Sequence, residues 1–385
     1  MRRLAAVLVV SMTLPALAPP APAAASPGSG PTAIVSLGDS FISGEGGRWL
    51  GNAVSLLGTR SGTDRAAYGC GSWGACAHDP HLVYGHSEDS GCHRSDVAPL
   101  LSAPIGVAVK ANLACSGAQA ENIWRAAAGG EWLRGEPPQA DRLAGLARGH
   151  DVRLVVLTVG ANNAGFGTLV LRCAVDWARS SEQAPSLCRR AAQDALEADL
   201  PAVARGVRKA LAEIRAAMSE AGYDRDSYRL VAMGYASPFP AGRWIRYPQW
   251  GWSRLRQGGC PLWDADADWA LSEATPAIDA ALRRAAAGAE AEFLDLQHAF
   301  DGHQLCDRRD RLAGAAGPSA VESEWFRRLG FAPGSLRESL HPNAYGQRAI
   351  GACLGLLYAA TPGGYACKGT PGQSYVDGMR LLPLR

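Results

Sequence analysis

Residues 33–46, AIVSLGDSFISGEG, decide the fold and supply the first candidate for a functional residue. The apolar run from Ala33 to Leu37 predicts a buried strand, and Gly38 allows a sharp turn after it. Ser40 then stands where a helix would begin, with its Oγ exposed and backbone N–H groups nearby, which suits a nucleophile. The same residues also fit an ordinary helix N-cap, because Asp and Ser are both good caps. Taken alone, this stretch leaves both interpretations open.

The composition is that of a large globular protein. The chain has 385 residues, of which 47% are hydrophobic and 19% charged, so it can bury a sizeable core. Its net charge of +2 gives no reason to expect nucleic acid or an anionic membrane surface as a partner. We find no internal repeat and no linker that would force two domains. We therefore expect one domain over residues 33–367, a C-terminal tail over 368–385, and a monomer.

The N-terminus has the pattern of a secretory signal peptide over residues 1–25. Arg2 and Arg3 supply the positive region, and residues 4–17 supply an apolar stretch too short to span a bilayer. Small residues before Ala25 suit cleavage near that position. No later run reaches transmembrane length, so we expect an exported, extracellular protein without stable membrane insertion.

The ten cysteines agree with an oxidising compartment. An even number allows five bridges and no free thiol. A metal site is the competing use, with Cys70, Cys76, His78 and His81 as its only basis. Because no CxxC pair occurs anywhere in the chain, we favour bridges and expect neither a metal nor another cofactor.

Strand-like and helix-like segments alternate along the chain, which predicts a parallel sheet with helices on both faces, in three α/β/α layers. Sites in such sheets form at the carboxyl ends of the strands. Ser40, Gly117 and Asn162 each follow the end of a predicted strand. Pro201 is expected to kink or divide the longest helix. The predicted strands are 33–37, 106–115, 152–159, 228–235 and 292–296, and the main predicted helices are 97–101, 139–148, 191–221, 267–287 and 345–359.

Two segments are expected to lie outside this pattern. Residues 47–95 are rich in Gly, Ser and His and predict a disulfide-stapled surface insertion directly after the nucleophile strand. We favour solvated loop positions for its histidines over a wall of the substrate cleft; they are His78, His81, His86 and His93. The tryptophan-rich segment 244–269 is expected to pack a long loop onto the body, with direct ligand contact as the alternative.

Ester hydrolysis by a serine needs a nucleophile, a base and donors for the developing oxyanion. Ser40 is the candidate nucleophile. Its own N–H, the N–H of Gly117 and the side-chain amide of Asn162 are the candidate donors. His341 is the best candidate base among the eight histidines, because it stands in a tight turn before the closing helix and Pro342 restricts the backbone at the next position.

Four blocks of residues stand in the order found in the GDSL, or SGNH, hydrolases, and the chain resembles that family from about residue 33 to about 360. The blocks are Gly38-Asp39-Ser40, Gly117 within residues 114–118, Gly160-Ala161-Asn162-Asn163, and His341-Pro342-Asn343. The resemblance implies a three-layer α/β/α fold of flavodoxin-like topology and carboxylic ester hydrolysis without a metal. It also implies the nucleophile, base and oxyanion-donor roles of Ser40, His341, Gly117 and Asn162.

The resemblance is greatest to the secreted bacterial esterases, lipases and phospholipases with three bridges. That likeness implies the pairs Cys92–Cys115, Cys173–Cys188 and Cys260–Cys306. We assign Cys70–Cys76 and Cys353–Cys367 by their proximity in the sequence.

The chain departs from the family pattern in two places. The third block usually ends in Asp, whereas here it ends in Asn163, which puts the local loop geometry in question. The last block usually has Asp three residues before the histidine, whereas here that position holds Glu338. Either Glu338 orients His341 and completes a triad, or the backbone carbonyl of Ser339 does so and leaves a dyad, which we favour.

These observations predict a secreted serine esterase or lipase acting on a small-molecule or lipid ester. A deacetylase acting on O-acetylated polysaccharide or on a secondary metabolite is the alternative within the same class. A non-catalytic carbohydrate- or lipid-binding module on the same scaffold is the alternative from another class, with the tryptophan-rich segment as its binding surface. The intact set of Ser40, Gly117, Asn162 and His341 argues against that module.

Overall fold

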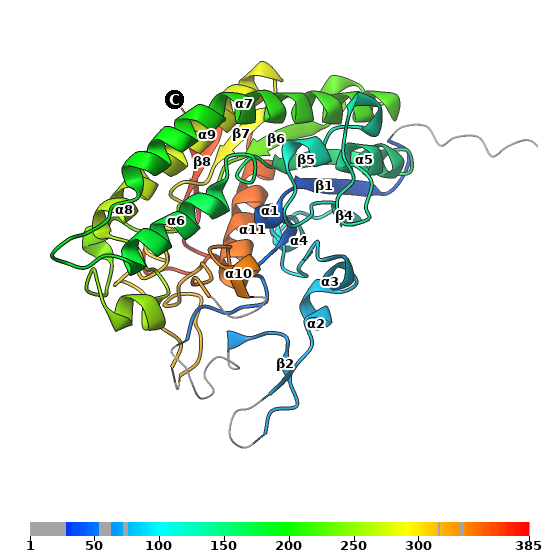
Figure 1. Cartoon of the computed structure of the whole chain (residues 1–385). Coiled ribbons are helices and arrows are strands. Elements are labelled where there is room, and N and C mark those ends of the chain that lie inside the picture. Colours follow the sequence, from blue (N-terminus) through cyan, green and yellow to red (C-terminus); the bar gives the residue numbers. More distant parts are fainter. Residues whose placement is uncertain (1–27, 54–62, 72–75, 315, 331–334, 385) are drawn as a thin grey trace, which may run out of the picture.

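The central sheet is assembled from strands that lie far apart in the sequence (Figure 1). The computed structural model describes residues 28–53, 63–71, 76–314, 316–330 and 335–384, so the predicted signal peptide lies outside the described residues. The sheet has seven strands in the order β4-β1-β5-β6-β7-β8-β9. Every neighbouring pair is parallel except β8 and β9. The strands are β1 (Thr32–Gly38), β4 (Val109–Asn112), β5 (Asp151–Thr158), β6 (Arg229–Met233), β7 (Glu292–Asp295), β8 (Tyr365–Lys368) and β9 (Arg380–Pro383).

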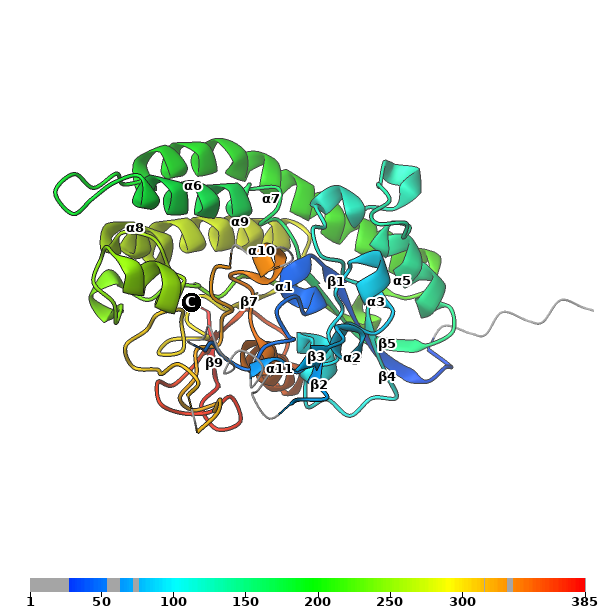
Figure 2. The same ribbon diagram turned by 60° about the horizontal axis from the view of Figure 1, so that its bottom comes forward.

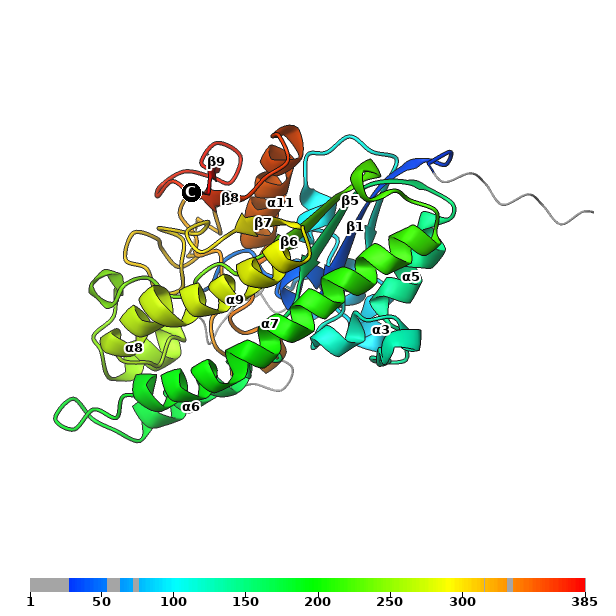
Figure 3. The ribbon, with the colours of Figure 1, turned by 90° about the horizontal axis from the view of Figure 1, so that it is seen from above.

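The helices cover the sheet on both faces. Helices α5 (Gln139–Ala147), α7 (Arg189–Glu220) and α9 (Thr275–Gly288) pack together on one face, and α4 (Pro99–Ser102) and α11 (Ala344–Ala359) pack together on the other. Figure 3 shows α7 and α9 on one side of the sheet and α11 on the opposite side. The first five strands of the order have the flavodoxin-like sequence 2-1-3-4-5 when they are renumbered by chain position. The predicted α/β fold class with a central parallel sheet is confirmed.

Burial explains why β5 occupies an interior position in the sheet. Seven of its eight residues are buried, from Asp151 to Thr158, and only Arg153 is exposed. A strand covered on both faces needs such a nearly continuous apolar run. It pairs with β1 so that Leu37 lies beside Leu157 and Gly38 beside Thr158. Consequently the segments after β1 and β5 leave the sheet side by side at the same edge.

The structure differs from the prediction at several elements. Pro201 does not divide the long helix, since α7 is assigned without a break; its apolar stripe, which includes Leu196, Leu200 and Val203, packs into the core and maintains the helix despite the missing N–H. Residues 368–385 are not a separate tail, because β9 pairs with β8 and extends the sheet. A helix that was not predicted, α6 (Phe166–Ala178), follows the third block.

The insertion after β1 forms a small layer beside the main body (Figure 1). It contains the two-stranded sheet of β2 (Ala67–Tyr68) and β3 (Ala77–His78) and two short helices, α2 (His81–Tyr84) and α3 (Ser87–Ser90). All ten cysteines are paired, and the pairs are the five expected from the sequence. Cys70 and Cys76 bind each other and are therefore not metal ligands. None of the helices in the described ranges combines the length and apolarity of a membrane span.

Candidate active site

The turn after β1 presents Ser40 at the start of the short helix α1 (Ser40–Ser43). Gly38 makes this turn possible, because a Cβ at that position would lie 1.9 Å from the carbonyl oxygen of Thr158 on the neighbouring strand. The Asp39 N–H donates to that same oxygen at 2.9 Å. The Asp39 side chain caps the helix by accepting a hydrogen bond from the Phe41 N–H at 3.0 Å. Both interpretations of the sequence therefore hold in part: Asp39 is the cap, and Ser40 is the presented hydroxyl.

His341 lies against Ser40 although 301 positions separate the two residues in the sequence. Its Nε2 atom lies 2.7 Å from the Oγ of Ser40, and its Nδ1 atom lies 3.0 Å from the backbone carbonyl oxygen of Ser339. A carbonyl oxygen only accepts, so Nδ1 carries the proton and Nε2 is left as the acceptor. Burial lowers the pKa of His341, which keeps the ring neutral. This is the geometry that a general base requires.

Glu338 does not orient His341. Its Oε2 atom accepts a hydrogen bond from the Trp49 indole at 2.6 Å, and its Oε1 atom accepts one from the Tyr84 hydroxyl at 3.0 Å. Both of these partners come from the insertion, so the Glu338 side chain leaves the turn toward that layer. Burial raises the pKa of Glu338. The structure therefore differs from a Ser-His-Glu triad and has the Ser339 carbonyl as the partner of Nδ1.

The two other predicted donors lie on loops after β4 and β5. Pairing beside β1 continues as far as Cys115, whose N–H donates to the Gly38 carbonyl oxygen at 3.0 Å, so Gly117 comes next to the turn that carries Ser40. Gly117 has a φ of 87°. The side-chain amide of Asn162 donates to the Ala118 carbonyl oxygen at 2.9 Å. Asn162 thus holds the Gly117 loop while it lines the same cavity as Ser40.

The side chain of Asn163, which stands where the family pattern has Asp, makes two hydrogen bonds that hold the local loop. Its Oδ1 atom accepts from the Ala120 N–H at 2.9 Å, and its Nδ2 donates to Glu121 at 3.0 Å. The amide therefore ties the loop after β5 to the segment that comes after Gly117, as both acceptor and donor. Loop geometry is maintained here without an acid.

Tyr235, which the sequence did not single out, joins two of the blocks. Its hydroxyl donates to Asp39 Oδ2 at 2.5 Å and accepts from the Ala161 N–H at 3.1 Å. Burial raises the pKa of Asp39 to about 7. Tyr235 comes just after the end of β6, so the sequence could place it at the carboxyl end of a strand. Nothing in the sequence indicated that its hydroxyl would bind Asp39.

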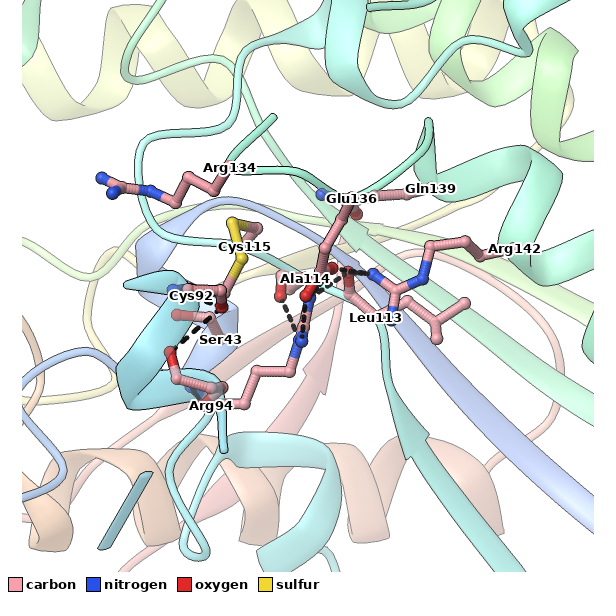
Figure 4. A network of polar contacts seen from close by, with 12 residues as sticks. Ser43, Cys92, Arg94, Leu113, Ala114, Cys115, Arg134, Glu136, Gln139 and Arg142 are labelled. Carbon is pink, nitrogen blue, oxygen red and sulfur yellow. Dashed lines mark hydrogen bonds and ion pairs between the residues drawn. A yellow bond between two sulfur atoms is a disulfide. The ribbon is translucent and has the colours of Figure 1, made fainter. Parts of the chain in front are cut away.

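A network of arginines fixes the loop between β4 and Gly117 (Figure 4). Arg94 donates to the Ala114 carbonyl oxygen at 2.7 Å and pairs with Glu136, which Arg142 also contacts. Burial alone would raise the pKa of Glu136, but Arg94 holds it below its usual range. The Cys92–Cys115 bridge anchors the same loop.

A second clamp acts on the end of β1, just before Ser40. The Gln139 side chain accepts from the Gly38 N–H at 2.7 Å and donates to the Gly38 carbonyl oxygen at 2.9 Å. Gln139 is buried at the start of α5. These clamps come from residues that are close to the site only in the folded chain, so no local motif marks them.

His93 was predicted to be solvated and is instead buried. Its Nδ1 atom lies 2.8 Å from the carboxylate of Glu45, and its ring stacks on Tyr84. Burial alone would lower the pKa of His93, but the hydrogen bond to Glu45 raises it. Burial alone would raise the pKa of Glu45, but His93 holds it below its ordinary value. The pair is therefore ionised next to His341. Burial lowers the pKa of His341, and the negative charge of Glu45 offsets part of that lowering. The other three insertion histidines, His78, His81 and His86, are exposed as expected.

An apolar cavity of about 410 Å³ opens beside Ser40. Helix α6 supplies one wall, and the turn before His341 supplies another. Its other lining is mostly apolar and comes from the ends of β5 and β6 and from α9. The residues that line it include Phe41, Ala161, Phe166, Val170, Leu171, Tyr235, Pro238, Ile278, Phe326, Leu329, Leu336 and Leu340.

A smaller cavity of about 40 Å³ adjoins the first and is also apolar. The two share seven lining residues and meet under α6; these are Phe166, Val170, Pro238, Thr275, Ile278, Leu329 and Leu340. Of the tryptophan-rich segment, Trp269 lines the smaller cavity and Trp263 is buried, whereas Trp250 and Trp252 are exposed. None of the four lines the cavity at Ser40.

The model of the GDSL-like lipase/acylhydrolase family matches residues 82–349, which is more than half of the chain. The chain belongs to this family. Phospholipase A1 from Streptomyces albidoflavus NA297 has a similar structure, with a TM-score of 0.50 and 20% identity over 86% of this chain and 99% of the other. The extracellular lipase from Streptomyces rimosus aligns with a TM-score of 0.48 and 20% identity over 86% of this chain and 100% of the other. A search of curated proteins finds no significant match.

Proposed function

We propose that this protein is a serine esterase that hydrolyses fatty-acyl esters through an acyl-enzyme on Ser40. The observation that carries the proposal is the 2.7 Å contact between Ser40 Oγ and His341 Nε2 at the edge of an apolar cavity. Membership in the GDSL-like lipase/acylhydrolase family supports ester hydrolysis. The reaction has two halves, formation and hydrolysis of the acyl-enzyme, and His341 transfers a proton in both.

In the first half of the reaction, Ser40 Oγ attacks the ester carbonyl carbon while His341 Nε2 takes the hydroxyl proton. The Ser339 carbonyl oxygen accepts from Nδ1 and stabilises the imidazolium. The Ser40 and Gly117 N–H groups and the Asn162 amide receive the oxyanion. When the tetrahedral intermediate collapses, the C–O bond to the alcohol breaks and His341 returns the proton to that alcohol.

In the second half, water attacks the acyl-enzyme carbonyl and His341 takes a proton from the water. The second tetrahedral intermediate releases the carboxylic acid, and the proton returns to Ser40. The acyl chain occupies the cavity under α6, where burying each methylene contributes about 0.8 kcal/mol. A cavity of about 410 Å³ is far larger than an acetyl group needs, which favours fatty-acyl esters over O-acetyl groups.

Export is part of the same proposal. Five disulfides suit an oxidising compartment, and the pattern of residues 1–25 suits a signal peptide. N-terminal sequencing of protein recovered from the culture medium tests this. A mature chain that begins near Ser26 supports export, whereas intact protein found only inside the cell contradicts it.

Hydrolysis of p-nitrophenyl octanoate by wild type and by the Ser40→Ala variant tests the enzymatic proposal. We expect the variant to lose at least a thousandfold in kcat. The matched control is Ser219→Ala, which removes an exposed serine hydroxyl at the far end of α7 and should retain full turnover. Turnover by Ser40→Ala comparable to wild type would refute the assignment.

A further inference from the structure

Two arginine side chains converge on Gly91, outside the acyl cavity. A Cβ placed on Gly91 would lie 2.8 Å from Nη1 of Arg134 and 3.5 Å from Nη1 of Arg337. A Cβ placed on Gly117 would lie 3.7 Å from Nη2 of Arg134. The two guanidinium groups therefore approach each other at Gly91, and Arg134 also reaches Gly117. Both arginine residues are exposed.

The orientation of Arg134 is fixed by its backbone contact. Its Nε donates to the Ser116 carbonyl oxygen at 3.0 Å, so its guanidinium lies beside the loop that carries Gly117. Figure 4 shows the guanidinium pointing away from the cluster in which Arg94 and Arg142 share Glu136. Arg134 is thus the one arginine of this group that the cluster does not neutralise.

Neither convergent arginine pairs with a carboxylate within the described ranges of the chain. The nearby acids have other partners: Glu136 binds Arg94 and Arg142, Asp89 lies 2.9 Å from His81, and Glu88 faces His93. Two like charges at such close range repel each other. An anion between them would remove that repulsion and accept charge-assisted hydrogen bonds from both.

The position of the pair relative to Ser40 indicates which part of a substrate it would meet. Helix α6, which lines the acyl cavity, and helix α3, which ends just before Gly91, lie on either side of α1 (Figure 1 and Figure 2). Arg134, Arg337, Gly91 and Gly117 do not line the acyl cavity. The proposed function places the acyl chain under α6, so we take the alcohol half of the ester to leave Ser40 on the side of Gly117 and the two arginines.

We propose that Arg134 and Arg337 form a binding site for a phosphate on the alcohol half of the ester, so that the preferred substrates are acyl esters of phosphorylated alcohols such as glycerol phosphate. This inference rests on the proposed function and specifies its substrate class. Guanidinium groups match phosphate oxygens by forming paired hydrogen bonds. The two arginines bind and position the substrate and take no part in proton transfer.

A matched pair of soluble substrates tests the site: 1-octanoyl-glycerol 3-phosphate and 1-octanoylglycerol, which differ only in the phosphate. We expect wild type to show a higher kcat/KM for the phosphorylated ester. The ratio of the two kcat/KM values should fall about tenfold in Arg337→Gln and in Arg134→Gln, mainly through KM. Arg337→Gln is the cleaner variant, because no hydrogen bond within the described ranges depends on that side chain.

Arg205→Gln is the matched control, since it removes one exposed positive charge from α7 without approaching the site, and it should leave the ratio unchanged. Inorganic phosphate should inhibit wild type competitively and inhibit Arg337→Gln more weakly. A ratio that is equal in wild type and Arg337→Gln overturns the inference, as does a ratio that Arg205→Gln lowers equally. If wild type hydrolyses neither ester, that result would instead contradict the proposed function.

Discussion

The Nδ1 atom of His341 lies 3.0 Å from the carbonyl oxygen of Ser339, while the Glu338 side chain, three residues before the histidine, binds Trp49 and Tyr84. The orienting role that an acid has in a triad is therefore taken by the backbone. A carbonyl fixes the tautomer as an acid would, but it brings only a partial negative charge to the imidazolium. Beyond the effect of burial, which lowers the pKa of His341, the ionised Glu45–His93 pair acts on this ring with opposite signs, since Glu45 raises that pKa and His93 lowers it.

Replacing Glu338 tests this arrangement. We expect Glu338→Gln to retain kcat within about tenfold of wild type, because the amide preserves the shape of the side chain and His341 keeps its carbonyl partner. Steady-state hydrolysis of p-nitrophenyl octanoate measures it. His341→Gln, in the same turn, should lose at least about a thousandfold. A loss of that size in Glu338→Gln would instead support a triad in which Glu338 is the acid.

The pH profile tests the electrostatics of His341. The base acts only when it is neutral, and burial lowers its pKa below the ordinary value of 6.5. A lower pKa means that the proton is lost at a lower pH, so the acidic limb of kcat/KM should have its midpoint below 6.5. The limb should persist in Asp39→Asn, which removes the other group near the site that titrates close to neutrality. A midpoint above 6.5 would show that Glu45 outweighs burial.

If the apolar cavity at Ser40 holds the acyl chain, as proposed, the enzyme should have a chain-length preference that one side chain can shift. Val170 on α6 lines both the large and the small cavity. Val170→Phe should fill the junction and move the optimum in a series of p-nitrophenyl esters toward shorter acyl chains. Val175→Phe is the control on the same helix, because Val175 is exposed and lines neither cavity. If both variants keep the wild-type profile, the acyl chain lies elsewhere.

Asp39 predicts how stability depends on pH. Burial raises its pKa from 3.8 to about 7 in the folded protein, so between these values the folded state binds a proton that the unfolded state lacks. That contribution to stability is fully present below 3.8 and is lost as the pH rises toward 7. Asp39→Asn cannot titrate but can still cap α1. The free energy of unfolding of wild type relative to this variant should therefore fall by a few kcal/mol between about pH 4 and pH 7.

Denaturant unfolding of both proteins at several pH values measures that difference. The other buried carboxyls with raised pKa values, such as Asp279 and Glu324, are present in both proteins and cancel in the comparison. Parallel pH dependence of the two proteins would contradict the raised pKa of Asp39.

The sequence predicted those parts of the fold whose signal is local. The apolar run of β5 and the three- and four-residue spacing of α7 both appear in the structure within two residues of the predicted bounds. Helix α6 was not among the predicted elements. Its apolar positions at helical spacing, Leu169, Val170, Cys173, Ala174 and Trp177, were the available signal.

In the site, too, only the features with a local sequence signal could be predicted. The order of the four blocks was enough to nominate Ser40 and His341, which the structure brings into contact. The direction of the Glu338 side chain, the clamp of Gln139 on Gly38 and the pairing of His93 with Glu45 all depend on partners at least 48 positions away. The spacing of residues along the chain does not predict such contacts, which are seen only in the folded structure.

The central claim is that Ser40 is the nucleophile, and covalent labelling tests it most directly. The wild-type protein is incubated with a fluorophosphonate, its intact mass is measured, and the labelled peptide is mapped. The account predicts one equivalent of label on Ser40, much slower labelling of His341→Gln, and none at this position in Ser40→Ala. Stoichiometric label on another residue, or equal labelling of Ser40→Ala, would contradict it.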